Sequence, residues 1–449
     1  MKTIHINNEI NAMATRAINE KINKGPIHDN LFKLRSVINA KRRLVAGSMY
    51  CLLVIADETA CRKNQVDPAD VEHCAPMRRN GQVHQETCKF IIWTQEWNGV
   101  EVISLPEKKC SSFTGQNLTE ESKSSVVSSL RAHVQPLDLV KWSKFTSFLA
   151  RFNKQYMTKR EYMHRFAVFK QNLALIKQMQ RHEKGTAIYG VTQFADLTPD
   201  EFAKMYLTPN WPNNTAETPD HQTTESVNWE LDSGTLPKAW DWRDHNVVTS
   251  VKNQGICGSC WAFATAGNVE GQWAIKTGQL TDLSVQELVD CDVLDDGCAG
   301  GLPRNAYREI IRLGGLESDY DYPYNARWQN QCLFNRTEIS ATISGWRSVP
   351  ENETDMAVWL YKNGPIAIGI NAFAQMFYWH GIAHPWDVFC DPNRLNHAML
   401  VVGYAEKSGM PFWIIKNSFG AHWGQAGYYL LFRGGGVCGL NRMCTSAYV

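Results

Sequence analysis

The sequence lacks several features that would place the protein in a whole class. Its 449 residues contain no run of about 18 apolar residues, so no transmembrane span is expected. The 46 Lys and Arg residues nearly balance 45 Asp and Glu residues, and a net charge of +1 argues against a dedicated nucleic-acid or membrane-surface protein. The opening residues, MKTIHINNEINAMATRA, contain no apolar stretch of the kind that a signal peptide has.

Cysteine is absent from residues 111–256, although the chain has 13 cysteines. Five lie between Cys51 and Cys110, and eight lie between Cys257 and Cys444. Two cysteine-rich blocks around a cysteine-free middle indicate two disulfide-bearing domains in an oxidising compartment. This pattern favours a sequence whose true start is missing over a cytosolic protein, so we expect a lysosomal or extracellular location. Candidate N-glycosylation sites support this expectation: Asn117, Asn213, Asn335 and Asn352.

Composition and periodicity divide the chain into three units joined by two linkers. Residues 1–110 have helical spacing over 18–38 followed by strand-like runs, which indicates an α+β domain. Residues 111–136 are a Ser-rich linker, and 137–207 form a helical unit. Residues 208–235 are rich in Pro, Thr and Asn and form a second linker, where cleavage is plausible. Residues 236–449 form the third unit.

The strongest chemical signal is QGICGSCWAF, residues 254–263. Cys260 opens an apolar-periodic stretch, and Ser259 before it is a candidate N-cap. A thiol at a helix N-terminus faces the positive end of the helix dipole, which favours the nucleophilic thiolate. Cys257 and Cys260 alone would also suit a zinc half-site or a redox dithiol. No second C-x-x-C or H-x3–5-H partner has suitable spacing, and no thioredoxin-like βαβ unit surrounds the pair.

The third unit resembles the papain family of cysteine peptidases over its whole length, from LPKAWDWR through GCAGGLPRNAY and NHAMLVVGY to GVCGLNRMC. The resemblance implies a two-lobe fold, with a helical lobe after Cys260 and a β-rich lobe. Cys260 would be the nucleophile, and His397, 137 positions later, its base. Asn417 would orient that base by a hydrogen bond, and Gln254 would form the oxyanion hole with the Cys260 backbone N–H.

The same resemblance implies further roles. Gly301 would pair with an extended substrate, and Trp423 would lie near the leaving-group side. An uncharged pocket would prefer Leu or Phe two residues before the cut, because burying such a side chain is worth roughly 1.5–3 kcal/mol. Its expected lining is Leu302, Pro303, Gly369, Leu395 and Met443. The implied disulfides are Cys257–Cys298, Cys291–Cys332 and Cys390–Cys438, with Cys444 left over as a competitor for Cys390.

Two positions depart from the family pattern. Phe419 stands where Trp usually shields the Asn–His hydrogen bond, so we expect weakened activity or altered leaving-side specificity. Asn396 stands where Asp is common, and the missing charge should modify the pH profile.

The other two units also have family resemblances. The helical face Glu161, Arg165, Phe169, Asn172, Ile176, Gln180 and the segment YGVTQFADLT are similar to the inhibitory prodomain of these peptidases. The segment CKFIIWTQEWNGVEVISLPEKKC resembles the end of a cystatin, which implies the pairs Cys61–Cys74 and Cys88–Cys110 and leaves Cys51 unpaired. The inhibitory loops depart from the cystatin pattern: residues 43–47 are RLVAG, and Glu96 precedes Trp97 in place of Pro. This domain order points to the cathepsin F branch of the family.

The sequence therefore predicts an α+β, papain-like endopeptidase zymogen that is activated at acidic pH and uses no metal or cofactor. Its expected partners are protein and peptide substrates, its own propeptide and cystatin-type inhibitors, and we expect a monomer. A rival hypothesis is a binding protein in which the first unit is a cystatin-type inhibitor and the peptidase is silenced. The intact set of Gln254, Cys260, His397 and Asn417 argues against silencing.

Overall fold

The computed structural model describes residues 2–3, 8–19, 23, 30–45, 47–62, 71, 73–75, 77–79, 82–83, 85–95, 100–104, 130–131, 134–156, 158–208, 211 and 236–449. They belong to two compact units, 1–164 and 165–449, which are considered one at a time. The boundary lies within helix α4 (Lys159–His182), inside the range 137–207 that the sequence groups together. Among the described helices, none is long and apolar enough to cross a membrane.

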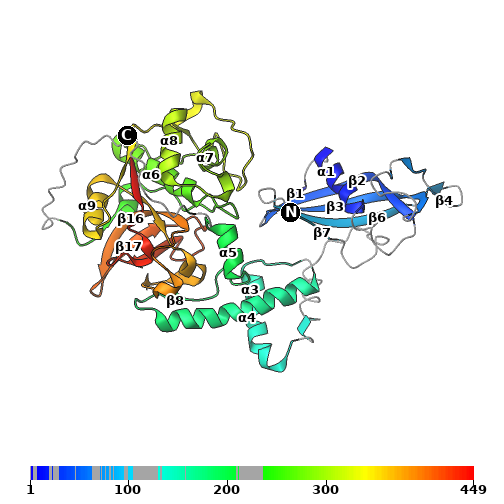
Figure 1. The fold of residues 1–449 in the computed structure, drawn as a ribbon, viewed down its shortest axis with the longest axis horizontal. Coiled ribbons are helices and arrows are strands. Elements are labelled where there is room, and N and C mark those ends of the chain that lie inside the picture. The colour runs from blue at the N-terminus through cyan, green and yellow to red at the C-terminus, as the bar shows by residue number, and fades with distance from the viewer. Residues whose placement is uncertain are drawn as a thin grey trace. The chain divides into compact units, whose positions relative to one another are not determined.

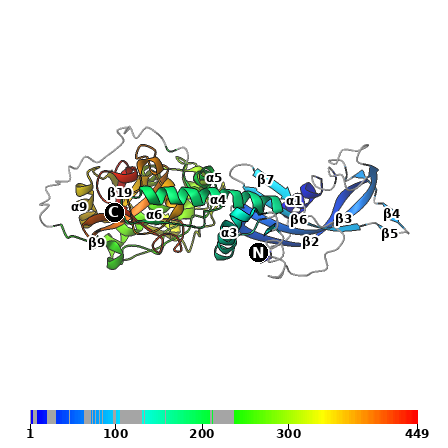
Figure 2. The same ribbon diagram turned by 90° about the horizontal axis from the view of Figure 1, so that it is seen from below.

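The first unit is built on an antiparallel sheet with the strand order β1-β2-β3-β6-β7. Helix α1 (Asn8–Ile18) lies across its long strands (Figures 1 and 2). Buried apolar residues recur every three or four positions on α1 and form one face against the sheet: Ile10, Met13, Ala14, Ala17 and Ile18. The strands are β1 (Lys2–Thr3), β2 (Asn30–Val45), β3 (Gly47–Arg62), β6 (Gln85–Gln95) and β7 (Val100–Ser104). Two short strands, β4 (Arg78–Arg79) and β5 (Gln82–Val83), pair separately.

The helix predicted over residues 18–38 is wrong, because α1 ends at Ile18 and residues 30–45 form β2. The buried residues Phe32, Val37 and Ala40 are separated by five and three positions rather than by two. Strand β2 pairs with β3 through register irregularities within 30–32, 34–36 and 37–39. Each such irregularity moves the following side chains to the other face of the sheet. The buried apolar residues of β2 therefore have a spacing close to that of a helix.

Several predictions for the first half of the chain concern residues that lie outside the described ones. These are the partner Cys110 of the pair Cys88–Cys110, the loop residues Glu96 and Trp97, the glycosylation sites Asn117 and Asn213, and most of both linkers. Within the described part, Cys61 and Cys74 form a disulfide. Val45 pairs with Gly47, so the described residues 43–45 and 47 lie at the end of the β2–β3 pairing. This unit also contains helix α3 (Leu139–Arg151).

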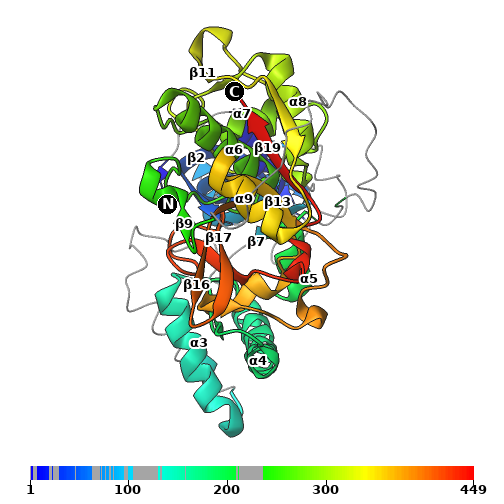
Figure 3. The same ribbon diagram turned by 90° about the vertical axis from the view of Figure 1, so that its left-hand side faces the viewer.

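The second unit combines a bundle of helices with a strongly twisted mixed sheet. Helices α6 (Cys260–Thr277), α7 (Val285–Cys291) and α8 (Pro303–Leu313) gather on one side, and β16 and β17 lie on the other (Figures 1 and 3). The sheet order is β12-β19-β13-β16-β17-β18-β15, with β9 paired to β16. Its strands are β9 (Trp240–Asp241), β12 (Gly345–Ser348), β13 (Ile366–Ile370), β15 (Ile382–Ala383), β16 (His397–Lys407), β17 (Met410–Lys416), β18 (Tyr428–Phe432) and β19 (Cys444–Tyr448). The strands β10 (Leu316–Glu317) and β11 (Ile339–Ala341) pair separately, and α9 (Glu353–Asn363) precedes β13.

Small residues bring α6 close to the sheet. A Cβ atom at Gly267 would lie 3.1 Å from Leu400 on β16, and one at Gly271 would lie 3.0 Å from Pro365. The helix ends at Gly278, whose φ of 77° is left-handed and costs glycine little. The N-terminal turn of α6 is thereby held beside the first residues of β16.

Residues 165–208 fold onto residues 236–449 of the same unit. On α4, Arg165 forms an ion pair of 2.7 Å with Glu201 on α5 (Pro199–Tyr206), and the amide of Asn172 donates to the carbonyls of Ala195 and Leu197. Farther along the same face, Gln180 Nε2 donates to Ala187 O. The helical stripe therefore supports the 187–201 segment.

That segment packs on a short strand within residues 236–449. Strand β8 (Ile188–Tyr189) pairs with β14 (Tyr378–His380), and Thr192 Oγ1 donates to Met376 O at 2.5 Å. A Cβ atom at Gly190 would lie 2.9 Å from the Trp379 ring, so only glycine fits this close approach.

Candidate active site

Cys260 begins helix α6 and is completely buried. Its Sγ accepts a hydrogen bond from Ala398 N at 3.4 Å and lies 3.6 Å from Thr208 Oγ1. Ser259 occupies the N-cap position, but its side chain makes no capping bond, contrary to the expectation from sequence. The Ser259 hydroxyl instead lies 2.6 Å from the Tyr324 hydroxyl, which also donates to Gln254 O. The backbone N–H groups of Cys260 and Trp261 act on the thiol, whereas those of Ala262 and Phe263 donate to Ser259 O.

His397 is the first residue of β16, and Asn417 directly follows β17. These strands are antiparallel neighbours, with Leu400 opposite Lys416, so the two side chains start at the same end of the sheet. His397 Nε2 and Asn417 Oδ1 are 2.9 Å apart. The Phe419 ring stacks on the imidazole with centroids 4.9 Å apart, and it is itself buried. Phe419 therefore covers the His–Asn bond with an apolar surface.

Gln254 is held beside Cys260 with its amide in a defined orientation. Its Oε1 accepts a hydrogen bond from Ser418 Oγ at 2.5 Å, which directs Nε2 the other way. Nε2 donates to Cys257 O and to Tyr206 O, each at 3.0 Å. A donor that is expected to stabilise an oxyanion is therefore occupied by a carbonyl of the chain's own residue 206.

Burial keeps the cysteine and histidine uncharged in this covered form. It lowers the pKa of His397 from 6.5 to about 4, and the hydrogen bond that Nε2–H donates to Asn417 Oδ1 opposes the shift. Burial also raises the pKa of the Cys260 thiol, against the effect of the Ala398 N–H and the Thr208 hydroxyl. The thiolate expected from the helix N-terminus is therefore disfavoured here, because desolvation outweighs the helix dipole.

Tyr206, Thr208 and Trp211 cover the site. Thr208 N donates to Asn396 O at 2.7 Å, while Asn396 Oδ1 accepts from Ala372 N at 2.8 Å. A Cβ atom at Gly300 would clash with the Thr208 methyl group. Thr208 and Trp211 belong to the stretch expected as a linker, yet both are buried. Composition did not reveal them, because neither residue belongs to a helix or strand with an apolar period.

The Trp211 ring lies in the predicted specificity pocket. A Cβ atom at Gly369 would be 2.9 Å from Trp211 Cζ2, 3.1 Å from Leu395 Cδ1 and 3.2 Å from Met443 Cε. Trp211 is only 8% exposed. Leu302 and Pro303 are buried at the start of α8, and their part in the pocket remains a prediction. Three of the five expected lining residues therefore meet around one bulky ring.

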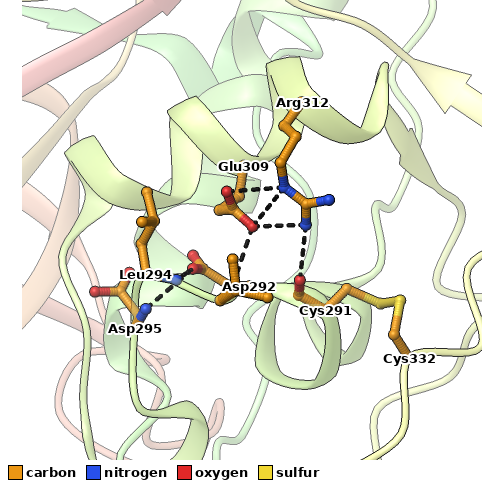
Figure 4. Close-up of polar contacts among 8 residues, drawn as sticks. Cys291, Asp292, Leu294, Asp295, Glu309, Arg312 and Cys332 are labelled. Atoms are coloured by element: carbon orange, nitrogen blue, oxygen red, sulfur yellow. Dashed lines mark hydrogen bonds and ion pairs between the residues drawn. A yellow bond between two sulfur atoms is a disulfide. The ribbon is translucent and has the colours of Figure 1, made fainter.

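Gly301 is enclosed by the loop that carries it. A Cβ atom there would lie 2.6 Å from the Trp261 ring and 2.7 Å from Asp295 Cγ, so the loop requires glycine at this position. The Asn305 amide donates to Asp295 Oδ1 at 2.8 Å, which ties the carboxyl group to α8. Asp292 Oδ1 accepts from the backbone N–H of Asp295 at 3.0 Å (Figure 4).

The two aspartates share a buried surrounding behind this loop. Burial raises the pKa of Asp295 to about 8, with the charge of Asp292 adding to the effect. Burial likewise raises the pKa of Asp292 to about 6, and the charge of Glu309 contributes. Glu309 is engaged by Arg312 in a fork with N–O distances of 2.7–3.0 Å (Figure 4). The pair therefore favours a state with at least one proton at neutral pH.

Trp423 and the cysteines complete the predicted site residues. Trp423 is buried, and its ring meets Phe419 edge-on at 5.5 Å. The peptidase part contains the three disulfides that the resemblance implies: Cys257–Cys298, Cys291–Cys332 and Cys390–Cys438. In the described part of the chain, Cys260 and Cys444 are the free cysteines.

Comparison with family models matches all three units. The models are a papain family cysteine protease over residues 236–448, a cathepsin propeptide inhibitor domain (I29) over 145–202 and a cystatin domain over 3–93. Because the second model describes an inhibitory propeptide ahead of the protease, the precursor is a zymogen.

Individual relatives agree with these models. Mouse (Mus musculus) cathepsin F is 45% identical over 418 residues, which cover 93% of this chain and 86% of that protein. Drosophila melanogaster cathepsin F is 40% identical over 82% of this chain and 60% of its own length. Among solved structures, a recombinant stem bromelain precursor is 32% identical with a TM-score of 0.60, over 69% of this chain and 99% of its own. The chain belongs to the papain family of cysteine proteases and is similar to cathepsin F, with a cystatin domain and an inhibitory propeptide ahead of the protease domain.

Proposed function

We propose that this precursor becomes an endopeptidase in which Cys260 attacks the scissile carbonyl and His397 transfers the protons. The observation that carries the proposal is the 2.9 Å bond between His397 Nε2 and Asn417 Oδ1, placed beside a thiol at the N-terminus of α6. This bond fixes the imidazole with Nδ1 free to exchange a proton with the thiol.

Once Tyr206, Thr208 and Trp211 leave, water and substrate enter and the ion pair of thiolate and imidazolium becomes favourable. The thiolate adds to the carbonyl carbon, and Gln254 Nε2 and the Cys260 N–H stabilise the oxyanion. His397 then protonates the leaving amine, which yields a thioester acyl-enzyme. A water molecule, deprotonated by His397, releases the acid and restores the thiol.

We propose that substrates carry a bulky apolar residue two positions before the cut. The support is Trp211, which fills the pocket of Gly369, Leu395 and Met443 with an aromatic ring. None of these three side chains carries a charge that could pair with Arg. A Leu or Phe residue gains roughly 1.5–3 kcal/mol from the same burial.

We also propose that acid triggers activation and that the protein acts as a monomer in a lysosome or outside the cell. The lowered pKa values of His397 and His384 support acid release, because both histidines gain protons more readily once uncovered. The disulfides support an oxidising location. Asn335 and Asn352 are exposed at helix starts, and each side chain caps its helix through Oδ1, which leaves Nδ2 for a glycan.

The test is hydrolysis of fluorogenic Phe-Arg and Leu-Arg peptides after the precursor is brought to about pH 5 with mild reductant, alongside a Cys260→Ala chain. We expect activity that appears with processing, is absent in Cys260→Ala and is far lower on an Arg-Arg peptide. A processed, folded chain without activity would refute the proposal and favour the rival inhibitor-type function.

A further inference from the structure

The amide of Asn417 has two distinguishable ends. Its Oδ1 faces His397 Nε2 at 2.9 Å and accepts from Ser418 N at 2.8 Å. A backbone N–H can only donate, so the atom beside it must be the oxygen. The Nδ2 group therefore points away from His397, into a region where Asn417 is only 3% exposed. A buried amide N–H needs an acceptor there.

Gln375 supplies that acceptor. Asn417 Nδ2 donates to Gln375 Oε1 at 3.2 Å, and Gln375 is completely buried. The other end of the Gln375 amide, Nε2, lies 3.1 Å from Met399 Sδ. Sulfur accepts weakly and does not donate, so this contact assigns the nitrogen to the Met399 side and the oxygen to the Asn417 side.

The backbone of Gln375 is anchored as firmly as its side chain. It lies in the short helix η9 (Phe373–Phe377), where its N–H donates to Ala372 O at 3.0 Å. Its carbonyl accepts from Trp423 Nε1 at 3.2 Å. Gln375 therefore joins Asn417 to Trp423, whose ring packs edge-on against the Phe419 ring over His397.

We propose that Gln375 is a positioning residue that holds the Asn417 amide in the orientation that presents Oδ1 to His397. The proposal rests on the proposed peptidase function, and it adds a second buried amide behind the one that orients the imidazole. Without Gln375 Oε1, the amide of Asn417 can rotate to find another acceptor for Nδ2, and the imidazole loses its fixed tautomer.

The experiment uses the full-length precursor, activated at acidic pH and normalised by active-site titration, with a fluorogenic Phe-Arg peptide. Gln375→Met keeps the volume and removes the acceptor. We expect kcat to fall by about tenfold, as one lost neutral hydrogen bond allows, with KM unchanged. The alkaline limb of the pH profile should move to lower pH, because the hydrogen bond from His397 Nε2–H to Asn417 Oδ1 favours the protonated imidazole.

Two matched variants separate positioning from packing. Gln375→Glu keeps an acceptor oxygen and should stay within about threefold of the unchanged chain. Met399→Leu disturbs the other neighbour of Gln375 and leaves the Asn417 bond in place, so kcat should change by less than about twofold. A loss of kcat in Gln375→Glu or Met399→Leu as large as in Gln375→Met would overturn the proposal. If Gln375→Met does not fold, the kcat of Gln375→Glu alone decides.

A double-mutant cycle gives the direct test. In an Asn417→Ala background, Gln375→Met should have almost no further effect on kcat, because the residue acts through Asn417. A tenfold loss in both backgrounds would refute this role. An inactive unchanged chain would refute the peptidase function itself, whereas an active chain that is indifferent to Gln375→Met would refute only the proposal for Gln375.

Discussion

Acidification is expected to open the covered active site, and His397 should account for much of the effect. Its pKa is about 4 in the covered form and returns towards 6.5 when water reaches it. The covered form therefore binds fewer protons. Above pH 6.5, titration of His397 has almost no effect on the free energy of closing the site. Below that pH the closed form loses stability, and the loss is complete at about pH 4. At pH 5 the loss is about 2 kcal/mol, so the equilibrium constant for closure falls roughly 20-fold relative to pH 7.

Hydrogen exchange at the amide of Thr208 measures this directly, because that N–H donates to Asn396 O only while the site is closed. A Cys260→Ala precursor, which cannot process itself, should lose about 20-fold in protection between pH 7 and pH 5 after correction for intrinsic exchange. The control is Cys260→Ala/His397→Gln, which cannot titrate at this position. It should lose less protection, with a remainder from His384. Equal losses in both chains, or no loss in the first, would refute the reasoning.

Three further substitutions test the cover, the carboxyl pair and the aromatic contact. Trp211→Ala empties the pocket and removes about 3 kcal/mol of closure, so autoprocessing at a fixed pH should be faster; an unchanged rate would contradict the pocket assignment. Asp295→Asn should raise the melting temperature of the precursor increasingly between pH 4 and pH 8, because the pKa is raised from 3.8 to about 8 and the ionised form destabilises the fold; a gain already complete at pH 4 would argue against titration. Phe419→Trp should overpack against Phe194 and Tyr206 and cost the precursor about 1–3 kcal/mol in thermal unfolding, while the processed enzyme, which lacks these rings, should show little loss.

The arrangement of the expected catalytic residues follows from local signals in the sequence. His397 and Asn417 each adjoin an apolar run, and these runs pair as β16 and β17, so spacing and motif together predicted their neighbourhood. The α+β class was also predictable, since periodicity marked the helix of residues 161–180. The bulges of β2 hid a strand behind helical spacing, because register depends on the partner strand rather than on the strand's own sequence.

Other parts of the site could not be predicted from residue patterns. Tyr206 is the last residue of α5, and Thr208 and Trp211 lie in no helix or strand, so composition assigned the last two to a linker. Gln375 lies in a single short turn outside every motif, and its role depends on a side chain 42 positions away. The neutral state of Cys260 arises from the cover, and a helix-dipole argument from the sequence cannot include that desolvation.

The Phe419 ring contacts the prodomain in the precursor, and we expect it to contact substrate after activation. In the precursor its ring meets Phe194 at 5.3 Å and Tyr206 at 6.0 Å, and it also contacts the His397 imidazole and the Trp423 ring. Under the proposed function, we expect the same apolar face to become available to substrate residues on the leaving side of the cut when those prodomain rings depart. A substitution at Phe419 is then expected to change substrate preference and the tightness of prodomain inhibition together.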